Sequence, residues 1–223
     1  MCGRFSIYSS MQAIENRFNA KSVFKFPVYY NAAPGLNLPI IINPDQNKEI
    51  LTKGIKNQIV SAKWGLIPHW SKEEKSAFKM INSRAETVSE KPSFKTYFKS
   101  QRCLIPANNF FEWKKTSKGK IPYLIKVKKE DLFSMAGIFS IWKDLSNKTN
   151  NKEIISFSII TTEPNKLTKK IHDRMPVVLS KGDEGKYLKE EDLEKVKKLL
   201  KPFDADRMEM FPVDMSEIYP WPA

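Results

Sequence analysis

The fold of this chain is decided by residues 102–141, RCLIPANNFFEWKKTSKGKIPYLIKVKKEDLFSMAGIFSI. Runs of β-branched, aromatic and other apolar residues alternate there with short polar segments, a pattern typical of successive β-strands joined by tight connections. The segments predicted to be strands are 102–105, 110–115, 123–127 and 133–141, and 115–120 is predicted to be a polar hairpin connection. Because hairpins join antiparallel neighbours, this region predicts an antiparallel sheet.

Further strands and a few helices are expected on both sides of this region. Ile155, Phe157 and Ile159 alternate with serines, which is the period of a half-buried strand. Other strands are expected at 2–8, 38–42, 59–64, 177–179 and 208–213, and helices after Ser9 or Ser10, at 92–99, after Thr162 and at 190–200. Strands dominate and do not alternate regularly with helices, so the sequence predicts an α+β fold of mainly antiparallel sheet, in one domain over residues 1–223.

The composition predicts a globular protein inside the cell. Of the 223 residues, 41% are hydrophobic and 28% are charged, which is the balance of a soluble domain. The longest apolar runs, 38–42 and 154–160, are far too short to cross a bilayer. The N-terminal residues lack the apolar stretch of a secretory signal. We therefore expect no membrane association, and a location in the cytoplasm or nucleoid of a bacterium or in the nucleus of a eukaryote.

The supply of metal ligands is small. The chain has two cysteines, Cys2 and Cys103, and two histidines, His69 and His172. An intracellular location favours reduced cysteines over a disulfide. A zinc site of the usual kind needs ligands that lie a few residues apart, and no two of these four residues do. The sequence therefore predicts neither a metal site nor a cofactor.

The charge balance points to a polyanionic partner. The formal net charge is +13 at pH 7, and a balance this basic favours nucleic acid. The alternative is that many of the lysines, such as those in 114–120, only solvate the surface. Charge becomes informative when it accompanies a site that needs a nucleic acid.

The second residue offers unusual chemistry. Aminopeptidases remove an initiator methionine when the next residue is small, so removal of Met1 is expected to expose Cys2. The α-amine of such a terminus titrates near pH 8, so roughly a tenth of it is unprotonated at pH 7, far more than for a lysine. This amine attacks aldehydes to give a Schiff base, and the neighbouring thiol can then close a five-membered ring. The alternative is a small buried cysteine behind a retained methionine.

Two residues in the second half of the chain could transfer protons. Glu112 lies inside the aromatic strand segment 110–113, where burial would raise its pKa toward neutrality. His172 lies in a polar turn and can exchange protons at physiological pH. The alternatives are a glutamate paired with a lysine at a sheet edge and a loop histidine bonded to a backbone carbonyl.

Two further segments could bind a reactant. Asn82 could orient a reacting group, and Arg84 could bind a phosphate, although a turn asparagine followed by a surface ion pair fits as well. Trp70 could stack on a base if it is exposed. Trp64 ends a strand pattern and is expected in the core.

Together these segments resemble the SRAP family, the SOS-response-associated peptidases or abasic-site-processing proteins. The matching motifs run in family order from residue 2 to about residue 180: CGRF from Cys2, YNAAPG from Tyr30, Trp64-Gly65 with Pro68 and Trp70, NSRAET from Asn82, the segment 103–113, and HDRMP from His172. One departure is Ala107-Asn108-Asn109, where the family commonly has Ala-Asp-Gly.

The resemblance implies a single SRAP domain with a barrel-like core and flanking helices. It implies that Cys2 captures the ring-opened aldehyde of an abasic site in single-stranded DNA as a thiazolidine, protecting the lesion during the DNA damage response. Asn82 would hold the cysteine and the sugar, and Glu112 and His172 would pass protons. Contacts with the DNA would come from Arg4, Asn31, Trp70, Arg84, Thr161 and Arg174. We expect a monomer whose partner is abasic single-stranded DNA.

Two other functions use the same residues. A cysteine peptidase could use Cys2, Glu112 and His172 for acyl transfer on itself or on other proteins, but it has no need of a net charge of +13. A basic nucleic-acid-binding module without covalent chemistry leaves the N-terminal cysteine unexplained. Salt dependence separates DNA capture from peptide cleavage, because only the former weakens steeply as salt rises.

Overall fold

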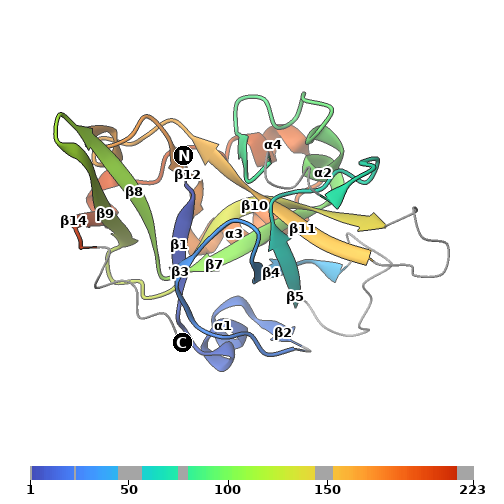
Figure 1. The fold of residues 1–223 in the computed structure, drawn as a ribbon. Coiled ribbons are helices and arrows are strands. Elements are labelled where there is room, and N and C mark those ends of the chain that lie inside the picture. Colours follow the sequence, from blue (N-terminus) through green and yellow to red (C-terminus); the bar gives the residue numbers. More distant parts are fainter. Residues whose placement is uncertain (1, 23, 45–56, 75–79, 144–152, 215–223) are drawn as a thin grey trace.

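The computed structural model describes residues 2–22, 24–44, 57–74, 80–143 and 153–214 (Figure 1). The described strands form two sheets. The five-stranded sheet is antiparallel throughout and has the order β14 (Met208–Pro212), β9 (Gly119–Val127), β8 (Asn109–Thr116), β1 (Arg4–Ile7) and β3 (Tyr29–Ala32). The antiparallel hairpin predicted from the sequence is therefore confirmed.

The larger sheet curls into a barrel. Its main path runs through β12 (Met175–Pro176), β11 (Glu153–Thr162), β10 (Phe133–Lys143), β7 (Arg102–Ala107), β4 (Asn37–Ile42), β5 (Asn57–Trp64) and β2 (Ala20–Ser22). A parallel pairing of β11 with β5 closes a ring of β5, β4, β7, β10 and β11. Two short strands attach to it, β13 (Val178–Leu179) on β10 and β6 (Asn82–Arg84) on β11. The expected barrel-like core is confirmed.

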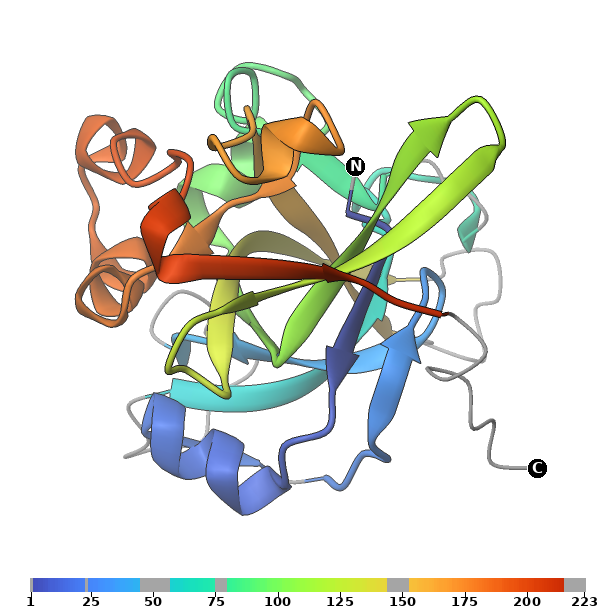
Figure 2. The same ribbon diagram turned by 90° about the vertical axis from the view of Figure 1, so that its left-hand side faces the viewer.

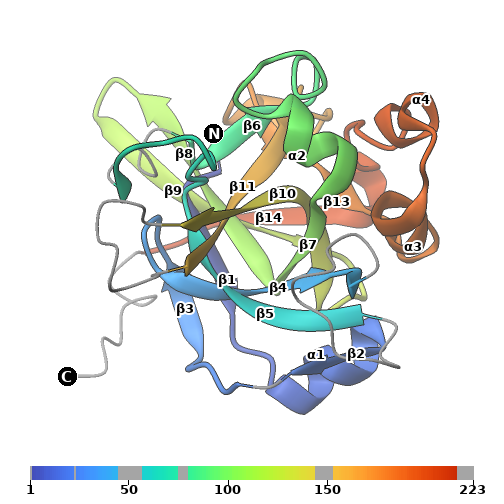
Figure 3. The same ribbon diagram turned by 90° about the vertical axis from the view of Figure 1, so that its right-hand side faces the viewer.

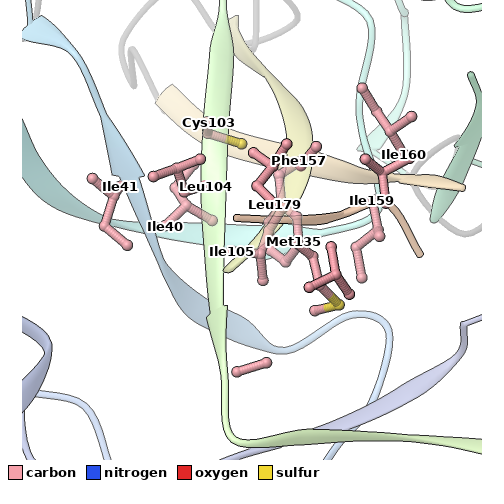
Figure 4. Close-up of a cluster of buried hydrophobic side chains, with 14 of the residues drawn as sticks. Ile40, Ile41, Cys103, Leu104, Ile105, Met135, Phe157, Ile159, Ile160 and Leu179 are labelled. Atoms are coloured by element: carbon pink, nitrogen blue, oxygen red, sulfur yellow. The ribbon is translucent and has the colours of Figure 1, made fainter. Parts of the chain in front are cut away.

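Apolar side chains from these strands fill the core (Figure 4). Ile40, Leu104, Ile105 and Met135 are among the buried residues that come from different strands of the ring. Gly137 on β10 leaves room for this packing, because a Cβ atom there would collide with the side chain of Ile105. The packed barrel thus supports the residues at the ends of its strands.

The helices lie around the sheets (Figure 3). They are α1 (Met11–Phe18), α2 (Lys95–Ser100), α3 (Lys181–Lys189) and α4 (Leu193–Lys197), with 3₁₀ turns at Thr168–Lys170 and Ala205–Arg207. The predicted N-cap of α1 is confirmed, since the Ser10 side chain accepts from the Ala13 amide at 3.2 Å. No helix within the described ranges is long and apolar enough to span a membrane.

Three helix predictions need correction. Thr162 does not cap a helix, because it is the last residue of β11, and Asn165 caps only a 3₁₀ turn by accepting from the amides of Leu167 and Thr168. The helix expected at 190–200 is limited to α4, since Asp192 caps it late. The helix expected at 92–99 begins only at Lys95.

Candidate active site

Cys2 lies two residues before strand β1, which pairs with β8 in the smaller sheet. The register of this pairing is Arg4 to Phe111, Phe5 to Phe110 and Ser6 to Asn109. Continuing this antiparallel register places residue 3 opposite residue 112. The N-terminal end of the chain therefore meets the buried part of β8.

Two asparagines at the turn before β8 secure this register. The Asn108 side chain accepts from the backbone amides of Tyr8 and Ser9 at 2.8 and 3.2 Å. Asn109 accepts from the Ser6 hydroxyl at 2.8 Å. Both asparagines are buried, so these bonds are shielded from water. Asn108 and Asn109, which differ from the Asp-Gly that is common in the family, thus hold β1 in its position beside β8.

Asn82 approaches Cys2 from the larger sheet. It begins β6, which pairs in parallel with β11 so that Asn82 lies opposite Ile159. Its Nδ2 donates to the Cys2 carbonyl at 2.9 Å. Its Oδ1 is buried and accepts no hydrogen bond from the described residues. A buried acceptor without a donor is costly, and a hydroxyl or amine of a bound reactant would satisfy it.

Glu112 is a buried carboxylic acid at this point. Its residue is 3% exposed, and β8 is an interior strand, so the alternative of a glutamate at a sheet edge is wrong. Burial raises the pKa of Glu112 to about 7. Near neutral pH the group is present in both its protonated and its ionised form, which suits a proton donor and acceptor.

His172 faces Glu112 from the turn that precedes β12. Its Nε2 lies 3.7 Å from Glu112 Oε2. Its Nδ1 lies 3.0 Å from the Arg174 amide and 2.8 Å from Asp173 Oδ1. Nδ1 cannot serve both at once, because it accepts from the amide when it carries no proton and donates to the carboxylate when it carries one. Burial lowers the pKa of His172, so the neutral ring dominates at pH 7. In the tautomer that accepts from the Arg174 amide, the proton is on Nε2, toward Glu112.

The Cys2 thiol is kept neutral by its surroundings. Cys2 has no exposed surface, and within the described ranges its Sγ makes one hydrogen bond, a long one of 3.9 Å to the Arg4 carbonyl. Burial raises the pKa of the thiol well above its usual range, and the negative charge of Glu112 raises it further. The thiolate is the reactive form, so any reaction at sulfur needs a nearby proton acceptor, and Glu112 is in electrostatic reach.

Four residues expected to contact DNA lie at the surface around this site. Arg4 and Asn31 are half-buried neighbours on β1 and β3, and Arg4 Nη1 donates to Asn31 Oδ1 at 3.4 Å. Arg84 is exposed at the end of β6. Trp70 is 59% exposed, whereas Trp64 is fully buried, as the sequence predicts for the core residue.

Of the other two residues expected to contact DNA, Arg174 is half-buried in an ion pair at the surface and Thr161 is buried. Arg174 forms a two-point ion pair with Glu86 at 2.7 and 2.9 Å, and its Nη2 also donates to the Thr161 carbonyl at 2.6 Å. Thr161 has no exposed surface. A phosphate contact by Thr161 would need a rearrangement, and a phosphate at Arg174 would have to share the guanidinium with Glu86.

The sequence does not predict the pairing of Glu86 with Arg174. The two residues are 88 positions apart. They meet because β6 and β12 both pair with the C-terminal end of β11. No local pattern carries this information.

Among the described residues, no group of three or more His, Cys, Asp or Glu side chains could hold a metal ion.

Comparisons with known proteins identify relatives of this chain. A protein of Bacillus subtilis (strain 168) named abasic site processing protein YoqW is 43% identical over 219 residues, covering 96% of this chain and 92% of that protein. The Xenopus tropicalis protein named abasic site processing protein HMCES is 30% identical over 182 residues, covering 72% of this chain and 53% of that protein.

A solved structure of a Bacteroides thetaiotaomicron protein is also similar, with a TM-score of 0.83 and 33% identity over 96% of this chain and 92% of that one. The family model described as SOS response associated peptidase (SRAP) matches residues 1–216. Since that match spans nearly the whole sequence, the chain belongs to the SRAP family.

Proposed function

We propose that this protein captures abasic sites in DNA covalently through Cys2 after Met1 is removed. The observation that carries the proposal is the convergence on residue 2 of three groups from distant parts of the chain. Asn82 holds the Cys2 backbone at 2.9 Å, and Glu112, with a pKa of about 7, lies 3.7 Å from His172. The names of the curated relatives support abasic DNA as the substrate.

The proposed reaction begins with the ring-opened aldehyde of the abasic sugar. The freed α-amine of Cys2 attacks the aldehyde carbon and forms a carbinolamine. Protonated Glu112 gives its proton to the hydroxyl group, water leaves, and an iminium forms. The resulting carboxylate takes the proton of the Cys2 thiol, and the sulfur adds to the iminium carbon. The product is a thiazolidine, one water has been lost, and Glu112 is protonated again.

His172 supports this exchange of protons. In its neutral form its Nε2–H faces Glu112, so it can stabilise the carboxylate that exists between the two proton transfers. In reverse, the same pair can protonate the ring sulfur and return water to the iminium carbon. We therefore assign His172 a part in both formation and reversal.

The finer features of the partner also belong to this proposal. The net charge of +13 and the exposed Arg84 and Trp70 favour a single strand whose phosphates and unstacked bases are accessible. The protein would act inside the cell, as one domain and as a monomer. The alternative, a peptidase that uses Cys2 to cleave its own first bond or other proteins, keeps the same residues but assigns no role to the charge.

The experiment that tests the function is an intact-mass measurement. The purified protein is mixed with a single-stranded oligonucleotide that carries one abasic site. We expect a species equal to the protein without Met1 plus the oligonucleotide minus one water. The absence of this species from a chain whose Met1 is gone would contradict capture and favour the peptidase.

Replacement of Trp70 by alanine is expected to weaken non-covalent binding of single-stranded DNA. Stacking of one base on an aromatic side chain contributes about 1–3 kcal/mol, so the Kd should rise between about 5-fold and 150-fold. Since Trp70 is 59% exposed, the thermal unfolding midpoint should change little. Fluorescence anisotropy with a labelled oligonucleotide measures the Kd.

The matched control is Phe211→Ala, which removes another exposed aromatic side chain, 44% exposed on the edge strand β14. It should leave the Kd unchanged. Equal affinities of both variants and the wild type would show that Trp70 does not stack on the DNA.

A further inference from the structure

The β8–β9 hairpin extends beyond the rest of the molecule, with the N-terminal end of β1 beside it (Figure 2). Glu112 lies near its base, and its outer half carries the exposed residues Lys114, Lys115, Lys118 and Lys120. None of these lysines forms an ion pair within the described part of the chain. The hairpin is therefore a cationic arm that starts at the active site.

The register of the hairpin opposes two of these charges directly. Lys115 lies opposite Lys120, two steps beyond the pair of Trp113 and Pro122. Residues directly opposite in an antiparallel pair share a face, with Cβ atoms about 4.5–5.5 Å apart. Like charges in such positions destabilise the sheet. This pair therefore weakens the hairpin unless an anion lies between the two ammonium groups.

Elsewhere in the same sheets, lysines in equivalent positions are neutralised. Lys126 lies opposite Glu209 on β14, with an ion pair of 3.2 Å. Lys143 lies opposite Glu153 on β11, with an ion pair of 2.9 Å. The chain thus places glutamate opposite lysine at two cross-strand positions and lysine opposite lysine at the one near the active site.

One member of the pair is also in electrostatic reach of His172. The positive charge of Lys115 lowers the pKa of His172, although burial and the charge of the N-terminus lower it more. A polyanion bound at this pair would therefore lie beside the turn that carries His172. The location and the sign of the charge both suit a strand whose reacting sugar is at Cys2.

We propose that Lys115 and Lys120 together bind a backbone phosphate of the DNA strand, next to the abasic sugar held at Cys2. The inference rests on the proposed function for the position of the lesion, whereas the phosphate contact itself needs only that the partner is a nucleic acid. One phosphodiester between the two ammonium groups replaces their repulsion with two attractive contacts. The hairpin then acts as an arm that holds the strand over the site.

The test compares two double variants that remove equal charge. Lys115→Gln with Lys120→Gln removes the proposed contact. Lys189→Gln with Lys198→Gln is the control, since both lysines are exposed on or beside α3 and α4, on the opposite side of the molecule (Figures 2 and 3). Binding of an undamaged single-stranded oligonucleotide is measured by anisotropy at several salt concentrations.

The hairpin variant should lose roughly tenfold in affinity at low salt, and the slope of log K against log salt should shrink by about 0.7, because one phosphate is no longer neutralised. The control should change neither quantity.

In addition, Lys115→Glu should mimic the stabilising pair of Lys126 and Glu209. It should raise the thermal midpoint of the free protein at low salt while it weakens DNA binding.

Equal affinity and equal slopes for the two double variants would overturn the proposal, as would a Lys115→Glu variant that binds like the wild type. Failure of the proposed function looks different. The wild type would then form no adduct with abasic DNA, while lysine-dependent binding of the undamaged strand could persist. An adduct formed with no dependence on the pair would reject the phosphate contact alone.

Discussion

Cys2→Ala is expected to abolish the stable adduct with abasic DNA while the Kd for an undamaged strand stays within about twofold of the wild type. Alanine is also small enough for Met1 to be removed, so the α-amine remains, but no thiol is left to close the ring. The imine that forms hydrolyses when the DNA is diluted. Intact mass after denaturation should therefore show free protein, and borohydride, which reduces the imine to an amine, should restore a covalent product.

Cys2→Ser is expected to fail in the same way, because a hydroxyl adds to an imine less favourably than a thiol and the ring reopens. The matched control is Cys103→Ala, which removes the other cysteine. Cys103 is buried in the barrel on β7, opposite Gly137 (Figure 4). That variant should lose stability because it leaves a small cavity, yet keep the adduct yield. A stable adduct from Cys2→Ala without borohydride would sink the mechanism.

The strands that the sequence predicts correctly include the long ones, which show a period, and also the short β1 and β13. Residues 155–159 alternate apolar and serine, and they lie within the ten-residue strand β11. The strand is confirmed, but the prediction that it is half-buried is wrong, because Ser156 and Ser158 have no exposed surface either. The strands that were missed are short. Asn82–Arg84 has three residues and Met175–Pro176 has two, so neither displays alternation, and both are defined only by pairing with β11.

The candidate site shows the same division. The chemistry of Cys2, Glu112 and His172 follows from residue type and local context, and the structure places Glu112 and His172 within 3.7 Å of each other. The burial of Thr161 and the engagement of Arg174 by Glu86 depend on which strands meet at the end of β11. Those contacts join distant segments, and no local pattern specifies them.

The lysine pairs across the strands are predicted only in part: the sequence shows the charges but not which residues they face. The sequence shows a lysine-rich connection at 115–120, for which solvation is the simplest account. Only the register, which sets Lys115 opposite Lys120 and Lys126 opposite Glu209, separates a repulsive pair from a neutralised one. Register depends on the turn and on the buried face of the sheet, and so it becomes visible only in the folded protein.

Glu112→Gln is expected to slow capture by about 100-fold or more, which is the usual contribution of a positioned acid–base group. It should also change how stability depends on pH. Burial raises the folded-state pKa of Glu112 to about 7, above its unfolded value of about 4.3. The folded protein therefore binds more protons in this interval, and the free energy of unfolding of the wild type should fall as pH rises from about 4.3 to 7.

Glutamine carries no charge at any pH, so the variant escapes this loss. The free energy of unfolding of Glu112→Gln minus that of the wild type should be near zero at pH 4 and on the order of 3 kcal/mol at pH 8. Urea unfolding at both pH values measures this difference. The control is Glu184→Gln, another buried glutamate, whose carboxylate binds Arg17 at 2.8 and 2.9 Å. Loss of that charge leaves Arg17 without its partner, so the control should be destabilised at pH 8 and should capture DNA at the wild-type rate. If Glu112→Gln captured DNA at the wild-type rate and its unfolding depended on pH as in the wild type, Glu112 would have no part in the mechanism. A buried ionisable group at the reacting centre must affect both the capture rate and the pH dependence of unfolding.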